Sequence, residues 1–264
     1  MRISGSTILL TGATGGLGQA IARALHARGG DLILTGRRVE VLGPLAGELG
    51  GARTLAVDLS DPAEVDRLVA EAGTVDILLA NAALPGAGRL ESFTMAEIDR
   101  ALNVNLRAPI ALAHALVPTM LKRDSGHLLF MSSLSGKSAT PGTAIYNATK
   151  FGLRGFASAL RADLHDSGVG VSAVFPGFIR DAGMFAEANV ELPGGVGTSS
   201  PDDVARAVLS AIERNRGEVD VAPIHMRAGA TFAGIAPELA SRVARRFGSH
   251  EIARDMEAGQ RGKR

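Results

Sequence analysis

The sequence predicts an α/β protein in which a parallel sheet of about seven strands is covered by helices on both faces. Short apolar runs recur along the chain, and they are unbroken rather than alternating with polar residues. Such runs are typical of strands that are buried on both faces. Longer segments with helical periodicity separate them. This repeated strand–helix order predicts a Rossmann-type, doubly wound sheet.

The apolar runs and the periodic segments give the expected elements. Strands are expected at Thr7–Gly12, Asp31–Gly36, Arg53–Leu59, Asp76–Ala82, His127–Ser132, Gly170–Pro176 and Glu218–Ala222. The clearest helical segments are Gly16–Arg28, Ala63–Ala72, Met95–Lys122 and Thr149–Ser167. We expect one dinucleotide-binding and catalytic domain over residues 1–264, with a mobile loop or short helical lid at 180–200 and a C-terminal helical extension at 224–264.

Composition excludes several classes of function. The net charge of +1 gives no reason to expect nucleic acid as a partner. The chain has no cysteine, which excludes disulfides, thiol catalysis and thiolate metal sites, and we expect no metal. The start of the sequence lacks the pattern of a signal peptide, and no run of about 18 apolar residues suggests a spanning helix. A cytoplasmic protein is the expectation.

A glycine-rich turn follows the first strand and opens the first helix. It reads Thr11-Gly12-Ala13-Thr14-Gly15-Gly16-Leu17-Gly18. Glycines let bare backbone approach a pyrophosphate, and a helix N-terminus supplies N–H groups and a positive dipole end. The alternative is an ordinary structural turn. The spacing T-G-x-x-x-G-x-G resembles that of the short-chain dehydrogenase/reductase family. We expect Gly12, Thr14, Gly16, Leu17 and Gly18 to bind the cofactor.

The end of the second strand predicts which cofactor is used. An NAD site usually has an acidic residue here for the ribose 2′-hydroxyl. This chain has Arg37 and Arg38 instead. A guanidinium can pair with the 2′-phosphate of NADP, so NADP is expected and NAD is less favoured. The alternative is that both arginines are solvated charges at the start of a helix.

Two further strand ends match the resembled family. Asp58 and Leu59 end the third strand, and Asn81 and Ala82 end the fourth. The resemblance implies that Asp58 contacts the adenine and that the asparagine triplet supports the cofactor. Ala83 stands where that family's triplet has glycine, which adds one methyl group. The alternative for Asp58 is a helix or turn cap.

A tyrosine and a lysine four residues apart predict the catalytic pair. Tyr146 and Lys150 share one face if this segment is helical, and an ammonium lowers the pKa of a nearby phenol. Ser133 ends an apolar strand 13 residues before Tyr146. The resemblance implies that these are catalytic, with Tyr146 as acid/base and Ser133 as a donor to the substrate oxygen. Ser132 and Ser135 are the alternatives to Ser133.

An asparagine inside a predicted helix completes the implied catalytic set. Asparagine is unfavourable inside a helix because its side chain competes for backbone hydrogen bonds. The resemblance implies a kink there and a water that leads to the lysine. Asn105 matches this position best and Asn103 is the alternative; either could also be a tolerated polar side chain.

The turn after the sixth predicted strand is implied to bind the nicotinamide. Pro176, Gly177 and Ile179 match the family's turn, in which Ile179 offers backbone groups to the carboxamide. Asp181 stands where the family commonly has threonine, which puts that contact in doubt.

These residues together predict an NADP-dependent oxidoreductase that interconverts a ketone or aldehyde and an alcohol by hydride transfer. The substrate is a small molecule and fairly apolar, because the expected lid carries apolar side chains. They are Phe178, Met184, Phe185 and Leu192. The alternatives are a catalytically silent NADP-binding scaffold or regulatory protein, and a lyase or epimerase that keeps its nicotinamide bound.

Two surfaces suggest further contacts. Gly152, Gly155 and Ala159 allow close helix approach, and the resemblance implies a homodimer or homotetramer through this helix. In the tail, Leu239, Val243 and Phe247 line one face beside arginines. This tail could lie on an anionic membrane surface, or it could be a surface helix that packs on its own domain or on a neighbouring subunit.

Overall fold

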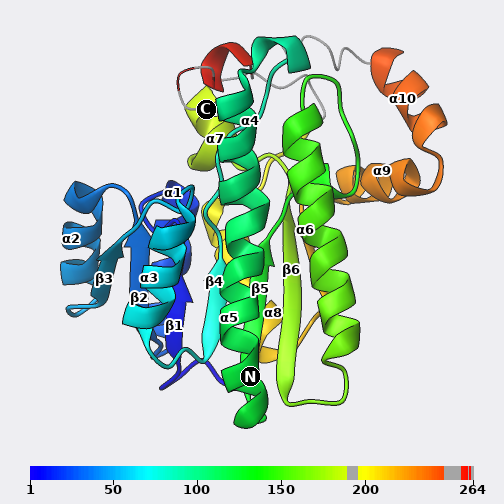
Figure 1. Cartoon of the computed structure of the whole chain (residues 1–264). Helices are drawn as coiled ribbons and strands as arrows, with labels where there is room; N and C mark the ends of the chain where they lie inside the picture. The colour runs from blue at the N-terminus through cyan, green and yellow to red at the C-terminus, as the bar shows by residue number, and fades with distance from the viewer. Residues whose placement is uncertain (189–195, 247–256, 261, 263–264) are drawn as a thin grey trace.

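The computed structural model has a seven-stranded sheet with helices on both sides (Figure 1). It describes residues 1–188, 196–246, 257–260 and 262. The strand order is β3-β2-β1-β4-β5-β6-β7, and every pairing is parallel. The order reverses between β1 and β4, which is where a doubly wound sheet binds its ligand. The predicted fold class is confirmed.

The seven predicted strands are all present, and several are shorter at the carboxyl end than expected. They are β1 (Thr7–Leu10), β2 (Asp31–Gly36), β3 (Arg53–Ala56), β4 (Ile77–Ala80), β5 (Gly126–Met131), β6 (Val169–Pro176) and β7 (Glu218–Val221). The shortening has a simple cause, because the residues that follow β1, β3 and β4 turn away from the sheet to form the site.

Helices cover the two faces of the sheet in two layers. One face carries α3 (Pro62–Ala72), α5 (Ala108–Lys122) and α6 (Ala144–Asp163), and the other carries α1 (Gly16–Ala27), α2 (Val39–Glu48) and α8 (Pro201–Glu213). Neighbouring residues of one strand enter different cores, since Leu9 packs in the first layer and Ile8 in the second. Apolar burial on both faces explains the unbroken runs in the sequence.

The long helix expected at Met95–Lys122 is interrupted. It consists of α4 (Met95–Leu102), a π-helical turn η2 (Asn103–Arg107) and α5. By length and mean hydropathy (1.2) this stretch could cross a membrane. Polar residues interrupt it, so it contains no unbroken apolar run of the kind used in the sequence prediction. However, 44% of its most apolar 18-residue part is buried in the protein, and α5 packs against α3, β4 and β5. Its apolar composition therefore serves the core.

The helix that carries Tyr146 and Lys150 begins earlier than predicted. We expected a helix over Thr149–Ser167, whereas α6 spans Ala144–Asp163. Tyr146 thus lies in its first turn and Lys150 in its second.

The C-terminal part of the chain adds three labelled helices and a short helical segment at 257–260. The labelled helices are α7 (Gly183–Ala188), α9 (Ile224–Ile235) and α10 (Pro237–Arg246). The last two project beyond the edge of the sheet near β7 (Figure 1). Large apolar side chains on them face solvent, among them Ile224, Phe232, Ile235 and Leu239. Leu192, Phe247 and the side chain of Val243 lie outside the described residues.

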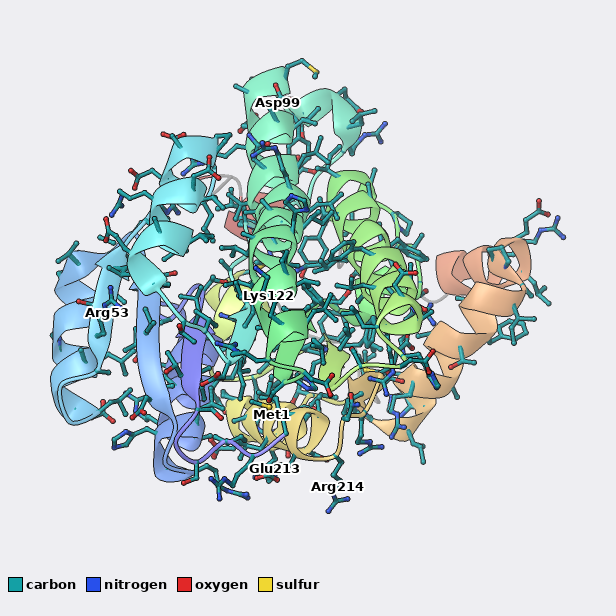
Figure 2. All side chains as sticks on the ribbon, turned by 60° about the horizontal axis from the view of Figure 1, so that its bottom comes forward. Met1, Arg53, Asp99, Lys122, Glu213 and Arg214 are labelled. Atoms are coloured by element: carbon teal, nitrogen blue, oxygen red, sulfur yellow. The ribbon has the colours of Figure 1, made fainter. Side chains whose placement is uncertain are left out.

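A buried histidine lies at the amino end of the sheet. His127 of β5 is 0% exposed, and its Nε2 lies 2.9 Å from the Ser172 hydroxyl of β6. Among the described residues its Nδ1 has no partner. Burial, together with the charges of the N-terminal ammonium and Arg161, lowers the pKa of His127 to about 3. Figure 2 shows Met1 at this edge, beside Glu213 and Arg214.

His127 should make the fold acid-sensitive. The unfolded chain binds a proton near the ordinary pKa of about 6.5, whereas the folded protein resists protonation down to about 3. Stability from this group is therefore complete above pH 6.5 and is lost as the pH falls toward 3. Denaturant titrations should show about 2 kcal/mol of this loss between pH 7.5 and pH 5. His127→Leu should remove that part of the pH dependence, and an unchanged slope would contradict the assignment.

Candidate active site

The glycine-rich turn joins β1 to α1 with bare backbone. Gly12 has φ +68°, a conformation that favours glycine. A Cβ on Gly18 would lie 2.2 Å from the Gly12 carbonyl oxygen, so that position requires glycine. The α1 N-terminus begins after Gly15, which caps it with no side chain, and its first turn has no acidic residue. Its N–H groups and its dipole are thus available to an anion.

Thr11 and Asn81 lock this turn to the end of β4. The backbone N–H groups of Asn81 and Ala82 donate to the Thr11 hydroxyl at 3.0 and 3.1 Å. The Asn81 side-chain amide donates to the Thr11 and Gly12 carbonyls at 3.1 and 3.2 Å. In this structure Asn81 therefore shapes the turn. Thr11 was not among the residues predicted to bind the cofactor.

The two arginines after β2 have different environments. Arg38 donates to the Thr14 carbonyl at 2.5 Å, so it is held against the glycine-rich turn. Arg37 is exposed, and its charge acts on Asp58. The two guanidinium groups are therefore not equivalent candidates for a phosphate.

Asp58 forms a turn before α3. Its carboxylate accepts from the backbone and hydroxyl of Ser60 at 3.0 and 2.8 Å. Burial raises its pKa, but these hydrogen bonds and the charges of Arg37 and Arg100 outweigh burial and keep the pKa below its usual range. The side chain thus makes the turn contact that was the alternative to adenine binding. The neighbouring Leu59 is buried in the core, so only its backbone could face a ligand.

Ser133 and Tyr146 meet at the carboxyl end of the sheet. Ser133 follows β5, where its hydroxyl donates to the Pro176 carbonyl at 3.4 Å and lies close enough to the Tyr146 phenol to lower the pKa of that phenol. The buried Ser132 hydroxyl instead donates to the Lys150 carbonyl at 3.1 Å. The backbone N–H of Ser135 donates to Ser133 Oγ at 3.1 Å, while its carbonyl accepts from Asn147. Of the three serines, Ser133 is therefore the one in contact with the tyrosine.

Burial controls the protonation of Tyr146 and Lys150. It raises the pKa of Tyr146 to about 12, and the hydrogen bond with Ser133 only partly opposes this. It also lowers the pKa of Lys150 to about 8. Lys150 Nζ donates to the Met131 carbonyl at 2.9 Å and lies 5.5 Å from the centre of the Tyr146 ring. The net lowering of the tyrosine pKa that was expected from Lys150 is therefore absent in this structure, because burial has the largest effect on the phenol.

Asn105 is buried in the π-helical turn η2. Its Oδ1 accepts from the Leu84 N–H at 2.6 Å, and its Nδ2 donates to the Leu84 carbonyl at 2.9 Å. The side chain therefore ties the loop after β4 to the helix. Asn103 donates to the Ser60 carbonyl at 3.2 Å, away from the catalytic pair. The break in the helix that was expected here is present as the π-helical turn η2. The Asn105 side chain itself hydrogen-bonds the Leu84 backbone.

The segment after β6 passes over the glycine-rich turn. Pro176 ends β6, and Gly177 packs against Ala222, where a Cβ would lie 3.0 Å from the alanine Cβ. Ile179 is buried and forms a bridge with Ser199.

Beyond this bridge the chain reaches the cofactor turn. Asp181 adopts φ +67°, and its carboxylate lies 3.5 Å from Arg180 Nε. A Cβ on Gly16 would lie 2.7 Å from the Ala182 Cβ, so the segment 180–188 and the glycine-rich turn are in contact.

These elements match a known protein family. The family model for short chain dehydrogenases covers residues 6–192. The chain belongs to this family. As a short-chain dehydrogenase it is an oxidoreductase with a nicotinamide cofactor.

Similar proteins carry more specific descriptions. The ketoacyl reductase HetN from a Nostoc strain is 34% identical over 227 residues, which span 83% of this chain and 79% of HetN. A short-chain dehydrogenase from Sphingobium yanoikuyae, solved with NADPH, is 28% identical with a TM-score of 0.78 and 88% and 94% coverage of the two chains. A metagenomic short-chain oxidoreductase solved with NADP is 32% identical with a TM-score of 0.69 and 84% and 97% coverage.

The cradle of this short-chain dehydrogenase fits a dinucleotide. The bare backbone around Gly12 and Gly18 and the uncapped start of α1 can receive a pyrophosphate. Arg37 is exposed directly after β2, and Lys150 reaches the Met131 carbonyl at the end of β5, on the other side of the switch point between β1 and β4. When bound, the nicotinamide would supply the hydride.

Two supporting features were missed by sequence reasoning. Gly86 packs on the catalytic helix, because a Cβ there would lie 3.0 Å from the Tyr146 Cβ. Lys137 follows the serine loop and is 8% exposed. Its Nζ contacts Asp220 at 2.6 Å and Glu218 at 2.9 Å on β7. These pairings join residues that are far apart in sequence, so no local pattern could reveal them.

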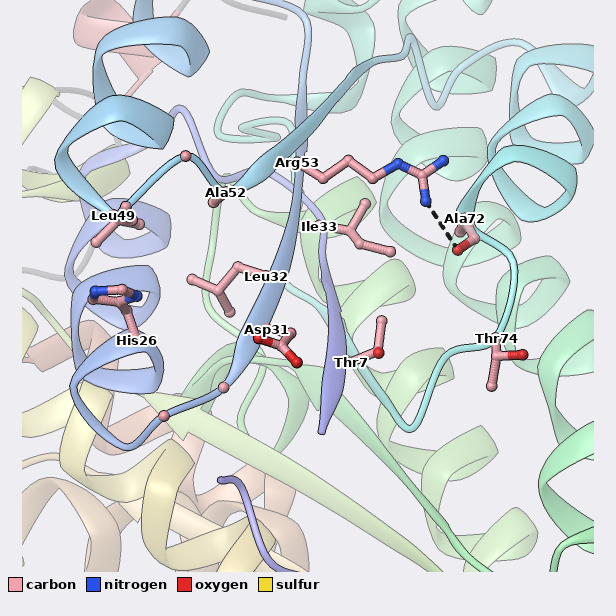
Figure 3. Close-up of a pocket in the computed structure, with 14 residues that line it drawn as sticks. Thr7, His26, Asp31, Leu32, Ile33, Leu49, Ala52, Arg53, Ala72 and Thr74 are labelled. Carbon is pink, nitrogen blue, oxygen red and sulfur yellow. Dashed lines mark hydrogen bonds between the residues drawn. The ribbon is translucent and has the colours of Figure 1, made fainter. Parts of the chain in front are cut away.

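A pocket of about 570 Å³ lies at the opposite end of the sheet (Figure 3). Thr7, Asp31 and Arg53 line it at the amino ends of β1, β2 and β3, and Arg53 donates to the Ala72 carbonyl there. Ligands of doubly wound sheets bind at the carboxyl ends instead. This pocket is therefore separate from the catalytic residues.

Proposed function

We propose that this short-chain dehydrogenase uses NADPH to reduce a ketone or aldehyde to an alcohol, with Tyr146 as the proton donor. The meeting of Ser133, Tyr146 and Lys150 beside the cofactor cradle is the observation that carries the proposal. In the proposed site the Ser133 hydroxyl donates to the substrate oxygen and polarises the carbonyl. Tyr146 then gives its proton to that oxygen as negative charge develops on it.

The positive charge of Lys150 favours this proton transfer. Its ammonium lies on the catalytic helix one turn beyond Tyr146, where it stabilises negative charge on the phenol after the proton has left. We assign it a second contact to the nicotinamide ribose. Asn105 acts through the backbone of Leu84, so we assign it a positioning role in this protein.

We assign the dinucleotide to the residues named from the sequence, within one domain over residues 1–264. Gly12, Thr14, Gly16, Leu17 and Gly18 form the pyrophosphate cradle. The adenosine end is assigned to Arg37, Arg38, Asp58, Leu59, Asn81 and Ala82, and the nicotinamide end to Pro176, Gly177 and Ile179. Residues 180–200 are assigned as the lid.

The cofactor preference depends on Arg37. Its exposed guanidinium can pair with the 2′-phosphate, whereas Arg38 is already held by the Thr14 carbonyl. Arg37→Asp should weaken NADPH binding roughly 10- to 100-fold, because a charge-assisted hydrogen bond is replaced by repulsion, and NADH binding should change little. Fluorescence titration with both cofactors measures this. Arg2→Asp, the same charge change at an exposed distant residue, is the control. Equal losses for the two cofactors would contradict the assignment.

The substrate proposed is an apolar acyl ketone. Phe178 and Phe185 pack together in the segment after β6, with 4.9 Å between ring centres and ring planes tilted by 52°, which supports an apolar pocket. The similarity to a protein named ketoacyl reductase favours the acyl class among apolar ketones. A panel of β-ketoacyl thioesters, steroid ketones and aromatic ketones, with NADPH oxidation as the readout, tests this choice.

Oligomerisation and membrane contact stay predictions. We propose that α6 pairs with α6 of a second copy, since Phe151 is 40% exposed and Gly155 has open space around it. The exposed apolar side chains of α9 and α10 fit both contacts predicted for the tail, which are an anionic membrane surface and a protein surface.

A further inference from the structure

The C-terminal segment 257–260 docks on α7, which belongs to the lid assigned above. Gln260 is 3% exposed although it is polar and close to the end of the chain. Its Nε2 donates to the Met184 carbonyl at 3.3 Å. A Cβ on Gly259 would lie 2.7 Å from both the Cα and the carbonyl oxygen of Ala188, so the two backbones are in close contact. Among the described residues, the contacts that carry the docking are this part-buried hydrogen bond and the close backbone approach at Gly259.

The docked helix α7 is itself in contact with the site. The Phe185 ring packs on Phe178, two residues beyond the Pro176 that ends β6. A Cβ on Gly183 would lie 3.5 Å from Leu17 of the glycine-rich turn. Movement of α7 therefore alters both the apolar wall next to the catalytic residues and the cover of the cofactor turn.

The same segment also reaches the loop after β4. The charges of Glu257 and Glu91 interact, and Glu91 lies in the short helix η1 (Leu90–Ser92). Figure 1 shows the C-terminal helix, coloured red, next to α7 above the carboxyl ends of the strands. The segment therefore lies near two segments that follow β4 and β6, the strands on either side of β5. Like charges repel, so the docking depends on the contacts of Gly259 and Gln260.

We propose that residues 257–260 form a clamp that holds α7 against Phe178 and the glycine-rich turn and so sets the affinity for the carbonyl substrate. Gln260 is a positioning residue in this clamp, because it acts through Met184 and contacts no reacting atom. The clamp predicts that the C-terminal end of the chain controls substrate binding while leaving proton transfer unchanged. The part about substrate affinity rests on the proposed reductase function.

Two glycines near the C-terminus provide a matched test. Gly259→Val places a side chain against the Ala188 backbone, whereas Gly262→Val adds the same group where nothing lies within 4 Å. Gly259→Val should raise the KM for the carbonyl substrate roughly tenfold, as expected for loss of a buried hydrogen bond and its packing, with kcat changed less than about twofold. Gln260→Ala should act in the same direction, and Gly262→Val should match the wild type.

A second readout is independent of activity. Amide hydrogen exchange of residues 183–188, measured on the whole chain without ligands, should be faster in Gly259→Val and Gln260→Ala than in the wild type and Gly262→Val. Equal exchange in all four proteins would overturn the clamp, even if KM changed. If the wild type reduced no carbonyl while exchange changed as expected, the clamp would stand and the reductase proposal would fall.

Discussion

Tyr146→Phe should reduce kcat for carbonyl reduction by about 10²- to 10⁴-fold, the range that general acid catalysis contributes. The phenylalanine keeps the ring and its packing but has no proton to give. The Gly86 backbone contacts the tyrosine backbone and Cβ rather than the hydroxyl, so the fold around the ring should persist. Steady-state NADPH oxidation measures the loss.

Cofactor binding provides the control for this variant. The glycine-rich turn and the hydrogen bonds between Thr11 and Asn81 that hold it do not involve the tyrosine hydroxyl. The Kd for NADPH should therefore change less than about threefold. The chain has one tyrosine and no tryptophan, so ultraviolet spectroscopy also reports directly whether this phenol ionises. A phenylalanine variant with full activity would remove Tyr146 from the mechanism.

Lys150 should give the reaction its alkaline limit. Burial lowers the lysine pKa to about 8, and Tyr146 stays protonated well above that pH. Reduction needs the proton on Tyr146 and the positive charge on Lys150, so kcat/KM should be level below pH 8 and should fall as the pH rises through it. Lys150→Met should lower kcat by roughly 10²-fold or more and should also abolish this fall. Initial rates between pH 6 and 10 measure both effects.

Lys150→Arg tests whether the positive charge of Lys150, rather than its shape, sets the alkaline limit. An arginine keeps its charge throughout this range of pH, so its residual activity should not fall near pH 8. The Met131 carbonyl, which accepts from Lys150 in the wild type, also loses its partner in Lys150→Met, and thermal unfolding controls for any loss of stability. A fall near pH 8 that persists in Lys150→Met would assign the limit to another group.

Much of the fold and of the site could be predicted because the signals are local. Strands buried on both faces are unbroken apolar runs, and a glycine-rich turn between a strand and a helix has few other uses. The spacing of Tyr146 and Lys150 places them one turn apart on α6 without any knowledge of the rest of the fold. The order of the motifs then indicated the family.

The remaining features depend on contacts between distant segments. Ser132 differs from Ser133 because its buried hydroxyl contacts α6. The pKa of Tyr146 depends on how completely the site is desolvated. Asn105 was expected to relay a water, yet its partner is Leu84, which is far away in sequence. The docking of Gln260 on Met184 joins residues 76 positions apart. Periodicity and motif spacing contain no information about such pairs.

Isotope transfer tests the central claim most directly. The protein would be incubated with NADPH that carries deuterium on the transferable position of C4, together with an apolar β-ketoacyl thioester, and the product would be analysed by mass spectrometry. We predict a secondary alcohol with one deuterium on the carbinol carbon, formed by the wild type and at a rate lower by about 10²-fold or more by Tyr146→Phe. Alcohol without deuterium, or a rearranged product with no net NADPH oxidation, would contradict hydride transfer from NADPH to the carbonyl.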